Sequence, residues 1–138
     1  MSRRKAREKA LQAIFQIDLG RTKVDNALES VFQESQLTEK DKEFVERIVK
    51  GTTEHLPEID AHLQEYAAGW SLDRMPNVDR NIMRLALYEL LYGQEASVNV
   101  IINEAVELAR RYSTEESSAY INGVLDTASK NVGTKGNR

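Results

Sequence analysis

The sequence predicts an all-helical protein, and three observations lead to that fold class. Ala, Leu, Glu, Lys, Arg and Gln, which favour helices, dominate the 138 residues. Apolar residues recur three and four positions apart, whereas the alternation typical of strands is nearly absent. The two prolines and seven glycines fall mostly where helices would begin or end. The β-branched run 98–102 could form a strand, but apolar residues continue after it at helical spacing, so we predict a helix there.

About seven helices account for the pattern, and three of them lie in the first part of the chain. The first covers residues 3–19, and we expect Gly20 to end it in the left-handed conformation. The second covers residues 24–34. Thr38 and Asp41 are typical of the start of a third helix. The pattern leaves open whether Gly51 ends this helix or lies within it.

Four further helices are predicted after residue 55. Pro57 suits the first turn of the fourth, and the break in periodicity at residues 68–71 is a candidate hinge. The fifth helix opens at Pro76, is apolar almost all round, and is therefore predicted to be the central buried helix. The sixth covers residues 98–112. A capping box, with Ser113 as the cap and Glu116 reaching back, predicts the start of the seventh.

Composition excludes several classes of protein. A chain of this length forms one domain, or two halves that share a core. Because there is no Cys, disulfides and thiol chemistry are excluded, which fits a reducing cytoplasm. No stretch approaches the roughly 18 apolar residues of a membrane span, so we expect neither export nor insertion. Residues 131–138, with two glycines and two basic residues, predict a disordered tail.

Charge is concentrated at the N-terminus. The first nine residues carry a net charge of +4, which leaves −7 for the rest of the chain; they contain Arg3, Arg4, Lys5, Arg7 and Lys9 against Glu8. The apolar stripe of the first helix extends backward onto Arg3 and Arg7, so we expect its first two turns to project beyond the body. Guanidinium groups bind phosphates and stack on unpaired bases, which favours an RNA partner.

The RNA hypothesis for this helix has alternatives, one for its charges, one for Phe15 and one for the partner. A basic N-terminus can simply keep a protein in solution. Its cations nevertheless oppose the helix dipole, a cost that an anionic partner would relieve. Phe15 lies on the same sector as Arg4, where it could stack on a base, although such a residue is more often part of a core. A third class of function, contact with an acidic protein, would differ from RNA binding in its salt dependence.

Four stretches of the sequence form recognisable motifs: Arg3-Arg4-Lys5-Ala6-Arg7-Glu8 with Ala10-Leu11-Gln12-Ala13 and Phe15; Trp70 followed by residues 79–90; residues 102–109; and Tyr120-Ile121-Asn122-Gly123-Val124-Leu125-Asp126. Together they resemble the NusB family of bacterial transcription antitermination factors. The resemblance runs in order along nearly the whole chain, except the second helix and the tail. Ser97 stands where the family commonly has a proline, a difference that affects a loop.

This resemblance implies both a fold and a function. The fold is two packed helical subdomains, here about residues 1–70 and 71–130. The function is to pair with NusE, a small-subunit ribosomal protein, and to hold the single-stranded boxA sequence of nascent ribosomal RNA. That complex helps RNA polymerase resist termination. Some relatives self-associate, so a homodimer is also considered.

The resemblance also implies two binding surfaces. The RNA surface comprises Arg3, Arg4, Lys5, Arg7 and Phe15, joined by Glu116 and Tyr120; the partner surface comprises Asp73, Asp79, Arg80 and Arg84. Without the family, Asp79 and Arg80 would be interpreted as charges on the first turn of a buried helix, and Tyr120 as core. We interpret Asn103 and Asn122 as buried polar residues and Gly123 as a position of close helix packing.

Catalysis is the competing hypothesis, and we expect none. His55, Glu58 and His62 share a helical face, but the spacings that bundles use for metals, His pairs four apart or Glu-x-x-His, do not occur. Nor does the sequence contain a phosphate-binding loop, a dinucleotide fingerprint or a nucleophile elbow. We therefore predict a binding protein without a metal or other cofactor.

Overall fold

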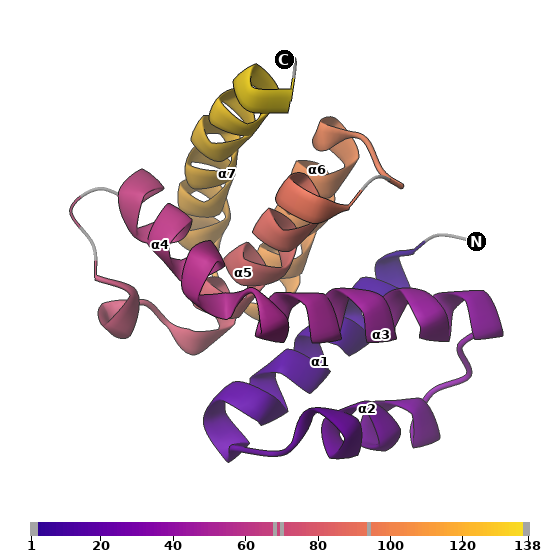
Figure 1. Cartoon of the computed structure of the whole chain (residues 1–138). Helices are drawn as coiled ribbons and strands as arrows, with labels where there is room; N and C mark the ends of the chain where they lie inside the picture. Colours follow the sequence, from indigo (N-terminus) through magenta and orange to yellow (C-terminus); the bar gives the residue numbers. More distant parts are fainter. Residues whose placement is uncertain (1–2, 68, 70, 94, 137–138) are drawn as a thin grey trace. The chain divides into compact units, whose positions relative to one another are not determined.

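The protein is all-helical, as predicted. A computed structural model describes residues 3–67, 69, 71–93 and 95–136, with side chains up to residue 131. No strand occurs in these ranges. The elements are α1 (Arg4–Gly20), α2 (Val24–Gln33), α3 (Glu39–Glu54), α4 (Leu56–Tyr66), the 3-10 helix η1 (Leu72–Arg74), α5 (Asn77–Tyr92), α6 (Val98–Tyr112) and α7 (Glu115–Gly136) (Figure 1). No helix in the described part of the chain is long and apolar enough to cross a membrane.

The chain divides into two compact units, residues 1–54 and 55–138. The boundary therefore lies between α3 and α4, not at the hinge expected at residues 68–71, of which Ala68 and Trp70 lie outside the described residues. The physical reason is that α4 packs against α5 and α7, which places it in the second unit. A local break in periodicity does not reveal such packing.

In the first unit, α1 packs against both α2 and α3. The start of α3 is capped as predicted, since the backbone N–H of Asp41 donates to Thr38 Oγ1 at 3.1 Å. Gly51 is buried within α3, which continues to Glu54. The predicted end of α1 is wrong by one residue: Arg21, not Gly20, takes the left-handed conformation, with φ of 53°.

In the second unit, α5 is the central helix. It contacts α4, α6 and α7, and ten of its residues are buried, which confirms the prediction. Pro57 lies in the first turn of α4, also as predicted. Ser97 caps α6, because its hydroxyl accepts from the backbone N–H of Val100 at 3.3 Å.

The ends of α7 differ from the prediction. Its cap is Thr114 rather than Ser113, since Thr114 Oγ1 accepts from the N–H of Ser117 at 2.9 Å. At the other end, the helix extends to Gly136, where the sequence predicted a disordered tail from Asn131. The Asn131 side chain donates to the carbonyl of Thr127 at 3.0 Å, which ties it to the preceding turn.

Candidate functional site

The basic end of α1 packs on α3 instead of projecting from the body. Arg3 Nη1 lies 3.3 Å from Asp41 Oδ1, and the Arg3 guanidinium lies 4.4 Å from the centroid of the Phe44 ring. The guanidinium of Arg7 lies 5.2 Å from the same centroid, and the residue is buried. The predicted projection is therefore wrong for these two arginines. Their guanidinium groups find a cation–π partner and their stems cover apolar surface within the unit.

Arg4 and Lys5 are the exposed members of the predicted basic set. Sequence reasoning missed a further cation, Arg47 of α3, whose guanidinium lies 5.6 Å from the Phe44 centroid. The spacing of Phe44 and Arg47, three residues apart on a helix, is a local signal that could have found this contact. Phe15 is half-buried, so base stacking and core packing both remain predictions for it.

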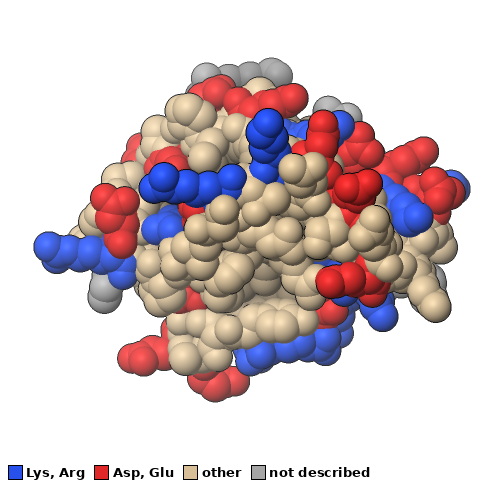
Figure 2. Space-filling view, turned by 90° about the horizontal axis from the view of Figure 1, so that it is seen from below, with Lys and Arg blue, Asp and Glu red and all other residues tan. Residues whose placement is uncertain are grey.

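Basic side chains do not form one continuous patch on the face drawn in Figure 2, where they stand among acidic ones. The balance nevertheless differs between the units. Residues 1–54 contain eleven Lys and Arg against ten Asp and Glu, a net charge of +1. Residues 55–138 contain eight against twelve, a net charge of −4. Any anion-binding role therefore fits the first unit better than the second.

The second unit carries a hollow beside the start of α5 and the start of α7. Its volume is about 370 Å³, and it is lined by Met75, Pro76, Asp79, Glu116, Ser117 and Tyr120. The hollow thus brings together residues that the sequence assigned to separate surfaces: Asp79 to the partner, Glu116 and Tyr120 to RNA. Ser117, which the sequence reasoning missed, lies in the first turn of α7, where a small polar residue carries no distinct signal.

Asp79 provides a buried hydrogen-bond acceptor in this hollow. The residue is only 4% exposed, and its Oδ2 accepts from the Ser117 hydroxyl at 2.6 Å. Its Oδ1 is buried and has no hydrogen-bond partner among the described residues. A buried carboxylate oxygen without a donor is costly, so this oxygen is suited to a donor group that arrives from outside. Beside it, burial raises the pKa of Tyr120, which keeps the phenol neutral.

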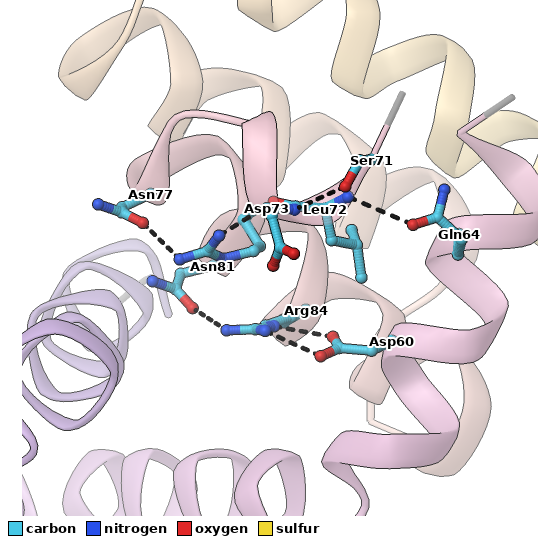
Figure 3. A network of polar contacts seen from close by, with 9 residues as sticks. Asp60, Gln64, Ser71, Leu72, Asp73, Asn77, Asn81 and Arg84 are labelled. Atoms are coloured by element: carbon cyan, nitrogen blue, oxygen red, sulfur yellow. Dashed lines mark hydrogen bonds and ion pairs between the residues drawn. The ribbon is translucent and has the colours of Figure 1, made fainter. Parts of the chain in front are cut away.

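The remaining residues of the predicted partner surface form a polar network at α4, η1 and α5 (Figure 3). Arg84 Nε and Nη2 both donate to the Asp60 carboxylate at 2.8 Å, and Nη1 donates to Asn81 at 3.0 Å. Arg80 Nη1 donates to the carbonyl of Leu72 at 3.0 Å. Asp73 is exposed. The arginines of the network therefore bind groups of their own unit.

Three polar or small positions behave differently from the sequence interpretation. Asn103 and Asn122 are exposed rather than buried. Gly123 is exposed as well, and a side chain there would meet nothing within 4 Å, so close packing does not explain this glycine. On a helix that turns 100° per residue, Asn103 and Gly123 lie on the face opposite the buried residues of their helices, so apolar neighbours in the sequence did not indicate their exposure. Among the described residues, no group of three or more His, Asp or Glu is arranged to hold a metal ion.

The described residues form an all-helical protein of two compact units, with a basic helix end in the first unit and a carboxylate-bearing hollow in the second. The family model of the NusB family matches residues 4–130, and the chain belongs to this family. It is 43% identical to the transcription antitermination protein NusB of Bacillus subtilis over 132 residues, 96% of this chain and 98% of that protein. To the protein of the same name in Desulforamulus reducens it is 47% identical over 125 residues, 91% and 87% of the two chains.

Solved structures show the same fold. T. maritima NusB aligns with a TM-score of 0.88 and 39% identity, covering 94% of this chain and 92% of that one. A crystal structure of the antitermination factors NusB and NusE in complex with double-stranded RNA aligns with a TM-score of 0.86 and 25% identity, over 95% and 99% of the chains.

Proposed function

We propose that this protein is a transcription antitermination factor that holds single-stranded boxA RNA of nascent ribosomal RNA transcripts together with NusE. The complex would help RNA polymerase resist termination in the cytoplasm. The observation that carries the proposal is the basic end of α1, in a chain whose family includes a NusB solved with NusE and RNA. The role is one of binding, and no catalytic step is assigned to any residue.

The RNA surface in this proposal starts at α1. Exposed Arg4 and Lys5 contact phosphates directly, whereas Arg3 and Arg7, packed on Phe44, add positive charge to the same end of α1. Phe15 is a further RNA contact on α1, and Glu116 and Tyr120 are RNA contacts of the second unit. The two aromatic rings favour unpaired bases over a duplex.

The partner surface comprises Asp73, Asp79, Arg80 and Arg84. Exposed Asp73 contacts NusE directly, while Arg80 and Arg84 hold η1 and α4 in place through the bonds described above. Asp79 Oδ1 takes a donor from whichever molecule occupies the hollow, which relieves the cost of its burial. A homodimer in the absence of RNA would cover the same basic end of α1 and therefore compete with RNA.

A titration with boxA-like RNA, with and without NusE, tests the proposal. Replacing Arg4 and Lys5 with Gln should weaken binding and flatten the salt dependence of log K by about 0.7 for each phosphate interaction that the substitutions remove. The matched control removes two cations from the second unit, Arg111→Gln with Lys130→Gln, and should leave affinity nearly unchanged. If both double variants bind as the unaltered protein does at every salt concentration, the RNA surface is not on α1.

A further inference from the structure

The proposed function leaves unused a cluster of rings and one carboxylate at the start of α4 and the end of α5. The His55 ring stacks on Tyr92, with centroids 4.2 Å apart and planes inclined by 21°. The Tyr88 ring lies 5.3 Å from that of Tyr92 and 6.3 Å from that of His55. Glu58 spans the stack: its Oε1 lies 3.6 Å from His55 Nδ1, and its Oε2 accepts from the Tyr92 hydroxyl at 3.3 Å. We call these four residues the ring–carboxylate cluster.

This cluster is open to solvent. Tyr92 is 39% exposed, and the side chains of Glu58 and His55 are 61% and 37% exposed. Both contacts of the Glu58 carboxylate are long, and a carboxylate accepts about four hydrogen bonds. Glu58 therefore keeps accepting capacity for a further donor, beside ring faces whose arrangement is already set by stacking.

The two elements that carry the cluster are acidic. The sequence contains no Lys or Arg from residue 51 to 73, and none from 85 to 109, so α4 and the second half of α5 carry only acidic charges. The cation that precedes Tyr88 by one turn of α5, Arg84, is 9% exposed and binds Asp60 through two donors. The negative electrostatic potential of these helices repels phosphate and attracts cations. A nucleic acid is therefore disfavoured as the ligand of the cluster.

We propose that the ring–carboxylate cluster docks an arginine side chain from a basic segment of a protein partner. A guanidinium stacks its plane on the exposed ring faces while two of its N–H groups donate to Glu58. A lysine ammonium has no planar group with two parallel N–H donors, so it cannot stack on the rings and donate twice to Glu58 at the same time. The site lies outside the RNA and partner surfaces of the proposed function and adds a second protein contact to them.

The test uses the full chain and two nine-residue peptides, one alternating Arg with Gly and one alternating Lys with Gly. In a two-dimensional amide NMR titration, the Arg peptide should shift His55, Glu58, Tyr88 and Tyr92 and bind severalfold more tightly than the Lys peptide. Glu58→Gln should weaken the Arg peptide by about tenfold. Glu65→Gln, a matched control that removes one exposed charge from the same helix, should change affinity by less than about twofold. Amide spectra of the free variants verify their fold.

Three results would overturn the proposal. Shifts that avoid the four cluster residues would show that the peptide binds elsewhere. Equal losses in the Glu58 and Glu65 variants would show that net charge alone attracts it. Shifts of the same residues by single-stranded oligouridylate, at comparable concentration, would show that the rings are a platform for bases instead.

Discussion

The ion pair between Asp60 and Arg84 allows a quantitative prediction. Both donors of the Arg84 fork lie 2.8 Å from the Asp60 carboxylate, and Arg84 is 9% exposed. Asp60→Ala would leave a largely buried guanidinium without its main acceptor. Breaking a fully buried pair in this way costs about 3–5 kcal/mol. The Asp60 side chain is 26% exposed, so water can reach the vacated donors, and we expect a loss of about 2–3 kcal/mol.

Thermal and urea unfolding measure this loss directly. With an unfolding entropy of about 2.1 cal/mol/K per residue, a chain of 138 residues has about 0.29 kcal/mol/K. The Asp60→Ala variant should therefore melt about 7–10 °C lower, followed by circular dichroism at 222 nm. The urea midpoint should fall while the slope of the transition stays the same.

A double variant distinguishes the contribution of the ion pair from the cost of leaving one buried charge unpaired. Asp60→Leu combined with Arg84→Met removes both charges and fills the space with apolar groups, but it also removes the donor to buried Asn81, so it should lose about 1–2 kcal/mol, less than Asp60→Ala. If Asp60→Ala alone loses less than about 0.5 kcal/mol, the pair behaves as an exposed one and the reasoning from burial is wrong.

Three further predictions concern single positions. Arg21→Gly should stabilise the protein by about 0.5–1 kcal/mol in urea unfolding, because a left-handed backbone strains a residue with a Cβ; a destabilised variant would contradict this. Thr114→Ala should cost about 1 kcal/mol and Ser113→Ala much less, since only Thr114 caps α7; equal losses would reject the assignment. Burial, and to a smaller extent Glu58, raise the pKa of Tyr92 above its ordinary value of 10.0. The neutral phenol therefore contributes to the free energy of unfolding below pH 10.0, and this contribution is lost as the pH rises through the raised pKa. Absorbance titration at 295 nm, assigned with Tyr92→Phe, should show the pKa of Tyr92 fall in Glu58→Gln, and an unchanged curve would refute the contribution of Glu58.

Periodicity predicted the helices well because a helix must bury one face whatever its neighbours are. The predicted start of the helix now called α5 and the predicted range of α6 agree closely with the structure for this reason. Helix ends were harder to predict. Ser113 and Thr114 are adjacent hydroxyl residues that can both cap a helix, and only backbone geometry selects one. Gly20 and Arg21 present the same problem, and the structure selects the residue with the less favourable side chain.

Charge composition located the basic end but not its geometry. That Arg3 and Arg7 pack on Phe44 depends on how α1 meets α3, and no local pattern specifies the register of two helices distant in sequence. The hollow presents the same limitation, since Asp79 and Ser117 are 38 residues apart. Such contacts follow from tertiary packing, so spacing rules cannot find them.

The charge difference between the units limits how RNA can use the hollow. The second unit has a net charge of −4, and both Asp79 and Glu116 line this hollow, so a phosphate placed there would meet two carboxylates. A base edge would avoid this repulsion, because its amino or imino N–H groups would donate to Asp79 Oδ1 and its ring would face Tyr120. In the proposed function, RNA phosphates therefore contact the basic end of α1, whereas any RNA group in the hollow is a base. A partner cation that entered the hollow would meet the same carboxylates favourably. Because Ser117 already donates to Asp79 Oδ2, RNA and the partner would compete for Oδ1, so the proposed joint complex requires that only one of them enters the hollow.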